Sequence, residues 1–238
     1  MSYTHAIQAF ASQTTLSLLG ALNNLLKDVH EDLAVTLVGG ALRDTHYAWK
    51  YGCGAAPKDY DFVLTGPVDQ YFDELYNKLQ DNTKFGKYID SYHSPRIANR
   101  GLSGILKFNY LGCECDILMF SDDRSMTSII KEFDADVNQV ALSWDYGKHN
   151  VFYTDAFRKA FTDSTYKLVC REEEYDELLF PNPKLQAREL KRLMNLQRKL
   201  PRFEMLDFPE FMERLDVVQG AEDEGLLNSN YIAPSPTL

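Results

Sequence analysis

The fold is decided by the sequence LVGGALRD at residues 37–44 and by KDYDFVL at residues 58–64. The first segment starts as a β-like run, ends that run in two glycines and continues into residues that favour a helix. The second segment reads as a strand and carries Asp59 and Asp61. Successive side chains of a strand point to opposite faces, so the two carboxylates share one face. The predicted order is strand, glycine turn, helix and acidic strand.

The acidic strand and the glycine turn suit one kind of ligand. Neighbouring carboxylates repel each other unless a cation lies between them, and Mg²⁺ prefers oxygen ligands. A turn such as Gly39-Gly40 at the start of a helix can offer backbone N–H groups to a phosphate. Together these features indicate metal-assisted chemistry on a nucleoside triphosphate. An Asp-x-Asp pair alone is weak support, because 21 aspartates are present and a second pair occurs at residues 134 and 136.

A third carboxylate is expected on a neighbouring strand. Residues 104–110 and 113–120 read as a hairpin whose second strand carries Glu114 and Asp116. Asp116 is followed by apolar residues, where a carboxylate is costly to bury unless it is paired or bound to a metal. Asp116 is therefore the preferred third ligand, whereas Glu114 lies nearer the turn. A solvent-exposed carboxylate at the hairpin end is the alternative.

Three motifs resemble a known family. They are Gly39-Gly40-x-x-Arg43-Asp44, Lys58-Asp59-x-Asp61, and the segment Phe133–Ala141, which matches at Asp134, Asn138 and Ala141. In this order they resemble the signature of the DNA polymerase β-like nucleotidyltransferases, and in particular the head domain of class II tRNA CCA-adding enzymes and bacterial poly(A) polymerases. The chain departs from that pattern at Phe133, where the family usually has arginine next to the nucleotide's sugar.

The resemblance implies an α/β (α+β) fold, with a small mixed sheet, packed helices and a helical C-terminal extension. The predicted division is a catalytic head at residues 1–150, a mostly helical extension at residues 151–218 and a tail at residues 219–238. The tail is predicted to be flexible from its composition, because the resemblance does not reach it. At 238 residues the chain has little room for the long RNA-holding body of the CCA-adding enzymes.

The resemblance also implies a role for each motif residue. Asp59, Asp61 and Asp116 would hold two Mg²⁺ ions, with Mn²⁺ as the alternative. Gly39 and Gly40 would donate backbone hydrogen bonds to the phosphates, and Arg43 or Lys58 would add positive charge. Asp134 and Asn138 would approach the sugar or the base. Read without the resemblance, Arg43 and Asp44 could be a surface ion pair, and Asn138 could bridge backbone groups.

The implied reaction moves a nucleoside monophosphate from an NTP to an acceptor hydroxyl and releases pyrophosphate. An RNA 3′ end, especially that of tRNA, is the first acceptor to consider. The alternatives are transfer to a protein or small molecule, as in toxin-like and antibiotic-modifying members, and a non-catalytic nucleotide-binding protein of the same fold. The net charge of −10 argues against broad, nonspecific nucleic-acid binding.

The segment at residues 184–202 is a local exception to the acidic balance. It reads as an amphipathic helix with leucines and Met194 on one face and a basic opposite face, formed by Arg188, Lys191, Arg192, Arg198 and Lys199. A solvated surface helix and a track for an RNA backbone are both consistent with this pattern.

The four cysteines show no paired spacing typical of structural zinc. The N-terminal residues lack the pattern of a secretion signal, and no apolar run approaches the roughly 20 residues of a membrane span. The sequence therefore predicts a cytoplasmic protein with no membrane partner.

Overall fold

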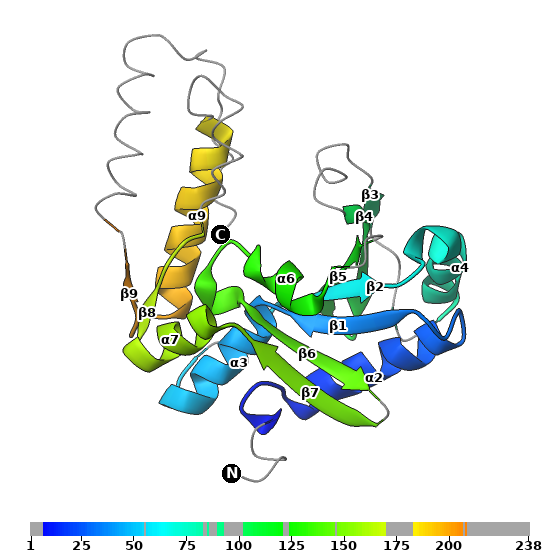
Figure 1. Cartoon of the computed structure of the whole chain (residues 1–238), viewed down its shortest axis with the longest axis horizontal. Helices are drawn as coiled ribbons and strands as arrows, with labels where there is room; N and C mark the ends of the chain where they lie inside the picture. Colours follow the sequence, from blue (N-terminus) through cyan, green and yellow to red (C-terminus); the bar gives the residue numbers. More distant parts are fainter. Residues whose placement is uncertain are drawn as a thin grey trace.

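The protein is built on a seven-stranded mixed sheet with the strand order β3-β4-β5-β2-β1-β6-β7 (Figure 1). The computed structural model describes residues 7–54, 56–82, 85, 90–92, 102–120, 124–145, 147–169, 183–206 and 208. The strands of the sheet are β1 (Ala34–Val38), β2 (Asp59–Thr65), β3 (Asp90–Tyr92), β4 (Leu102–Tyr110), β5 (Cys113–Phe120), β6 (Val140–Asp145) and β7 (Lys148–Tyr153). The predicted α/β class with a mixed sheet is confirmed.

The centre of the sheet places the acidic strand beside the predicted hairpin. β2 pairs with β1 in antiparallel orientation and with β5 in parallel orientation. In the β2–β5 register, Asp59 faces Glu114 and Asp61 faces Asp116. β4 and β5 form the expected antiparallel hairpin around the turn at Leu111-Gly112. The strand that carries Asp116 is thus the direct neighbour of the strand that carries Asp61.

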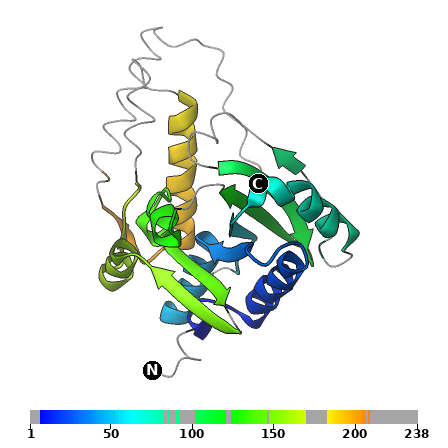
Figure 2. The ribbon, with the colours of Figure 1, turned by 45° about the vertical axis from the view of Figure 1, so that its right-hand side comes forward.

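The two faces of the sheet are covered differently. On one face, helix α2 (Gln13–Lys27) and helix α3 (Gly40–Tyr51) pack against the strands (Figures 1 and 2). Alternate residues of β2 enter this main core, namely Tyr60, Phe62 and Leu64. On the other face, helix α6 (Met126–Lys131) contributes Ile129 and Ile130 to a smaller cluster with Val63. Val63 shares its strand face with Asp61, so the carboxylates lie on the same side of the sheet as this smaller cluster.

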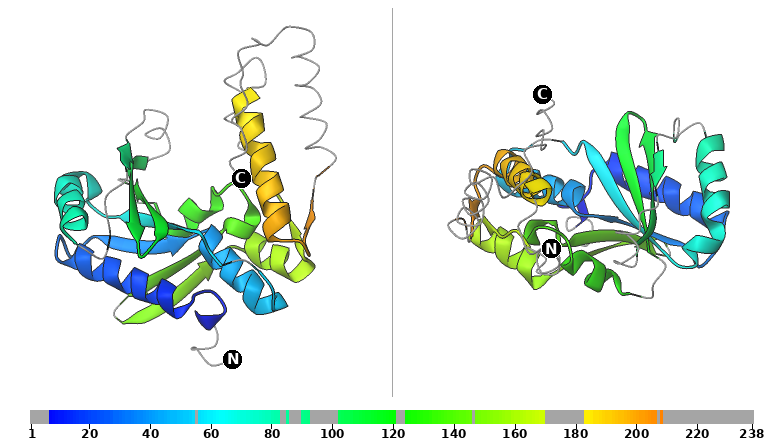
Figure 3. Two further views of the ribbon diagram at one scale, coloured as in Figure 1. Left: turned by 180° about the vertical axis from the view of Figure 1, so that it is seen from behind. Right: turned by 90° about the horizontal axis from the view of Figure 1, so that it is seen from above.

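The C-terminal part continues the same core. Helix α7 (Asp155–Asp163) follows the sheet, and β8 (Thr165–Tyr166) pairs in parallel with β9 (Glu204–Met205). Helix α9 (Pro183–Lys199) stands along one side of the molecule (Figure 3). Its buried residues Leu193 and Leu196 belong to the main core. The division into a head and an extension stays a prediction, and the expected tail lies outside the described residues.

Helix α4 (Val68–Asp81) lies at the opposite end of the sheet from α9 (Figure 1). Its buried residues Val68, Leu75 and Leu79 face the main core. Among the helices that the structure describes, none has the length and apolar character needed to cross a membrane.

Candidate active site

The three predicted carboxylates lie on two adjacent strands. Asp59 is exposed at the start of β2, Asp61 is half-buried one pleat further on, and Asp116 is half-buried on β5. Burial and the negative charges of Asp59, Asp116 and Asp134 raise the pKa of Asp61 to about 7, and the charge of Lys107 opposes that rise. Three neighbouring acids therefore act on Asp61, and Lys107 only partly compensates their negative charge.

Lys107 is a site neighbour that the sequence reading missed. Its Nζ atom lies 2.6 Å from Oδ2 of Asp116, and the two residues face each other in the β4–β5 register. The signal was present in the sequence, because a hairpin centred on the turn at Leu111-Gly112 places residue 107 opposite residue 116. A lysine at that position partly neutralises the third carboxylate.

The donor set suits a hard divalent cation. Asp59, Asp61 and Asp116 supply only carboxylate oxygens. The pKa of Asp61 is raised first by burial and then by its acidic neighbours, whose negative charge a cation would offset. Within the part of the chain that the structure describes, no three acidic, histidine or cysteine side chains converge closely enough to form a ready-made metal cage. Asp116 is held by its ion pair with Lys107.

The glycine turn is shaped by Gly39. Its backbone has φ 72° and ψ −129°, a conformation essentially restricted to glycine, and its N–H donates to the carbonyl of Val140. A Cβ added at Gly39 would lie 3.5 Å from the ring of Phe133, so Phe133 packs against the turn. Of the two predicted backbone donors, the Gly39 N–H is thus used within the protein. Gly40 begins α3, whose first turn receives no side-chain cap.

Arg43 and Asp44 form a buried ion pair, and the surface pair considered from the sequence is wrong. Both residues are about 95% buried, and Nη2 of Arg43 lies 2.6 Å from Oδ1 of Asp44. Nη1 of Arg43 also donates to Oδ1 of Asn138, at 2.5 Å. Asn138 in turn donates from Nδ2 to Oδ1 of Asp134, at 2.8 Å. Arg43 therefore holds Asp44 and Asn138 in place, whereas Lys58 is exposed just before β2.

Two basic residues of α9 attach to this chain of polar contacts. Nε of Arg192 lies 2.7 Å from Oδ2 of Asp134, and Nζ of Lys199 lies 2.9 Å from Oδ2 of Asp44. The basic face expected for RNA is therefore divided: these two residues face the protein, whereas Lys191 and Arg198 are exposed. The side chain of Arg188 lies outside the described residues. Met194, expected on the apolar face, is 62% exposed.

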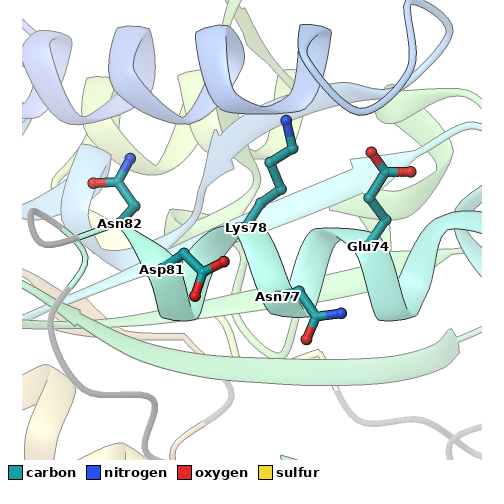
Figure 4. Close-up of a pocket in the computed structure, with 5 residues that line it drawn as sticks. All are labelled: Glu74, Asn77, Lys78, Asp81 and Asn82. Atoms are coloured by element: carbon teal, nitrogen blue, oxygen red, sulfur yellow. The ribbon is translucent and has the colours of Figure 1, made fainter.

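A hollow along α4 is separate from these groups (Figure 4). It is lined by Glu74, Asn77, Lys78, Asp81 and Asn82, none of which belongs to the predicted site. Its lining is polar and of mixed charge, and Lys78 already donates to the carbonyl of Asp28. The candidate active site is the carboxylate face of β2 and β5 with the adjoining glycine turn.

Comparison with known proteins identifies the architecture. No protein-family model and no curated protein matches the sequence. Among solved structures, a CCA-adding enzyme of Thermotoga maritima complexed with tRNA matches over 94% of this chain and 46% of its own, with a TM-score of 0.57 and 14% identity. The chain has a nucleotidyltransferase fold.

Two further structures share the nucleotidyltransferase fold. A CCA-adding enzyme in complex with ATP matches over 91% of this chain and 44% of its own, with a TM-score of 0.55 and 15% identity. A tRNA nucleotidyltransferase complexed with a primer tRNA and an incoming ATP analogue matches over 86% and 51%, with a TM-score of 0.50 and 17% identity. The chain thus spans about half the length of these proteins. The resemblance inferred from the motifs is confirmed at the level of the fold.

Proposed function

We propose that this protein is a metal-dependent nucleotidyltransferase that moves a nucleoside monophosphate from an NTP to an acceptor hydroxyl. The observation that carries the proposal is the register of β2 against β5, which sets Asp61 opposite Asp116 on the sheet face beside the Gly39-Gly40 turn. A carboxylate set next to an uncapped helix N-terminus matches the needs of a metal–triphosphate complex.

The residues divide the chemistry among them. Asp59, Asp61 and Asp116 would hold Mg²⁺ or Mn²⁺, which when bound activates an acceptor hydroxyl and offsets charge on the leaving pyrophosphate. The N–H groups of the first turn of α3, beginning at Gly40, face the triphosphate, and Lys58 adds positive charge. Asn138 and Asp134 approach the nucleotide's sugar or base.

We propose an RNA 3′ end, first that of tRNA, as the acceptor. Support comes from the tRNA complexes among the solved structures of the same fold and from the exposed cations Lys191 and Arg198. One observation favours the second candidate, transfer to a protein or small molecule. Arg192 and Lys199 are engaged by Asp134 and Asp44, which leaves less basic surface for RNA on a chain of net charge −10.

A labelling experiment tests the proposed reaction and distinguishes the two candidate acceptors. The protein is incubated with Mg²⁺, each α-labelled NTP in turn, and total cellular RNA and protein, and the label is then resolved by gel. We expect label in a tRNA-sized band, absent with Asp61→Asn and present with Asp81→Asn, a matched change of an exposed acid on α4. Label in a protein band with the same dependence on Asp61 would favour the second candidate. Equal labelling by Asp61→Asn would refute the site.

A further inference from the structure

Two basic residues of helix α9 form ion pairs with acids on other elements. Arg192 pairs with Asp134, and Lys199 pairs with Asp44. The two acids are the ends of one connected series of side chains, since Asp134 is joined to Asn138, Asn138 to Arg43, and Arg43 to Asp44. These four residues lie on α3 and on the segment 134–138 before β6, at least 45 residues away from α9 in the sequence. One helix therefore closes both ends of the series.

Asp44 and Asp134, at the two ends of the series, each need a cationic partner because they are buried or half-buried. Asp44 and Arg43 are each about 5% exposed, and the side chain of Lys199 is 23% exposed. Asp44 accepts from Arg43 at Oδ1 and from Lys199 at Oδ2, so each carboxylate oxygen has a cationic donor. Asp134 likewise uses Oδ1 for Asn138 and Oδ2 for Arg192. Removing a donor would leave a buried or half-buried carboxylate oxygen without its cation, and the acid would be free to rotate.

The geometry of the helix fits a two-point attachment. Arg192 and Lys199 are seven residues apart, which is two helical turns, so both side chains project from one side of α9. Leu193, Leu196 and Leu200 are buried on the same side and set the helix against the core. Lys191 and Arg198 have the same spacing but are exposed, which shows that the register of the helix selects one basic pair for the interior.

We propose that Arg192 and Lys199 are positioning residues for NTP binding. They hold Asp134 and Asp44, and through these acids they fix Asn138, which approaches the nucleotide's sugar or base, and the buried Arg43 that binds Asn138. The inference rests on the proposed function and deepens it. It assigns the inward basic pair to the nucleotide, and it leaves the outward pair, Lys191 and Arg198, to an anionic acceptor.

Binding of a non-hydrolysable ATP analogue with Mg²⁺, measured by calorimetry, tests this assignment. Two inward variants, Arg192→Gln and Lys199→Gln, are compared with their outward matches, Arg198→Gln and Lys191→Gln. We expect the inward changes to weaken binding by roughly 10-fold or more, as loss of a supporting contact commonly does, and the outward changes to leave it as in the wild type. Circular dichroism spectra and melting curves establish that each variant is folded at the temperature of the titration.

Conservative variants keep the test decisive. Arg192→Lys and Lys199→Arg retain a cation at each position, so we expect them to recover most of the affinity that the glutamine variants lose. If the wild type binds the analogue and the inward glutamine variants bind it equally well, the positioning role is overturned while the proposed function stands. If the wild type binds no nucleotide, the proposed function fails, and this inference fails with it.

Discussion

Lys107 and Asp116 face each other across the β4–β5 hairpin, with Nζ 2.6 Å from Oδ2. The side chain of Lys107 thus occupies a carboxylate oxygen that the proposed metal ion would need. A metal ion and the lysine ammonium would compete for the negative charge of Asp116. Replacing Lys107 should therefore separate the stability that the ion pair contributes from the stability that a bound metal ion contributes.

We expect Lys107→Met to lower the stability of the metal-free protein by about 1 kcal/mol or less, because the pair is partly exposed. We also expect Mg²⁺ to raise the melting temperature of the variant more than that of the wild type, because the ion no longer displaces an ammonium. Melting curves with and without Mg²⁺ check this, with Lys148→Met on β7 as the exposed-lysine control. A smaller Mg²⁺ shift in Lys107→Met would show that the lysine assists the ion.

Two Arg–Asp ion pairs with the same separation differ in burial, so we expect them to contribute differently to the free energy of unfolding. Nη2 and Oδ1 are 2.6 Å apart both in the buried Arg43–Asp44 pair and in the exposed Arg158–Asp155 pair. Asp44→Asn should cost about 3–5 kcal/mol in free energy of unfolding, because it leaves buried cations without their carboxylate. Asp155→Asn should produce little change, since solvent already screens that pair. Urea unfolding of both variants measures the difference, and equal losses would contradict the prediction.

The glycine turn predicts opposite results for two neighbouring substitutions. Gly39→Ala should destabilise the fold by about 1–3 kcal/mol, because φ 72° with ψ −129° is strained for any residue with a Cβ. Gly40→Ala should leave stability unchanged or slightly higher, since its Cβ would contact only the guanidinium of Arg43, with Nη2 nearest at 3.6 Å. Chemical denaturation compares the two. A large loss in Gly40→Ala would mean that the start of α3 is more constrained than its geometry indicates.

The same Gly40→Ala variant also tests the phosphate assignment. Its methyl group would lie at the start of α3, where the proposed function places the triphosphate, so we expect weaker binding of the ATP analogue by a folded protein. Calorimetry of this variant beside the wild type measures the effect. Unchanged affinity would place the phosphates away from the glycine turn.

We expect His46 to make the stability of the protein sensitive to mild acid. Its ring stacks on Phe10, with the ring centroids 4.3 Å apart. Burial lowers the pKa of His46 from 6.5 to about 4; a hydrogen bond to the backbone of Ala9 opposes this shift, and the charge of Lys50 adds to it. The unfolded chain therefore binds this proton first, so stability should be lost as the pH falls from 6.5 towards 4, by on the order of 2 kcal/mol. We expect His46→Phe to flatten the dependence over that range. Unfolding curves measured at several pH values test this, and parallel profiles for the two proteins would contradict it.

Local patterns predicted the parts of the site that depend on neighbouring residues. The alternation of β2 correctly divided Asp61 from Phe62, and the hairpin reading correctly brought Asp116 to a strand beside it. The burial of the Arg43–Asp44 pair was not predictable from local patterns, because the pair makes long-range contacts such as that of Asp44 with Lys199, 155 residues away. Which basic residues of α9 face the protein likewise depends on which of its leucines pack into the core. Helical spacing alone does not determine which leucines do so.

The register of β2 has a consequence for how this sequence can vary. The strand carries the carboxylates on one face and Tyr60, Phe62 and Leu64 on the other. Loss or gain of a single residue early in the strand would exchange the faces, sending an aspartate into the main core and an aromatic ring to the carboxylate face. An insertion or deletion that moves the carboxylates would therefore also disrupt the main core, so the packing of Tyr60, Phe62 and Leu64 and the spacing of the carboxylates depend on the same register.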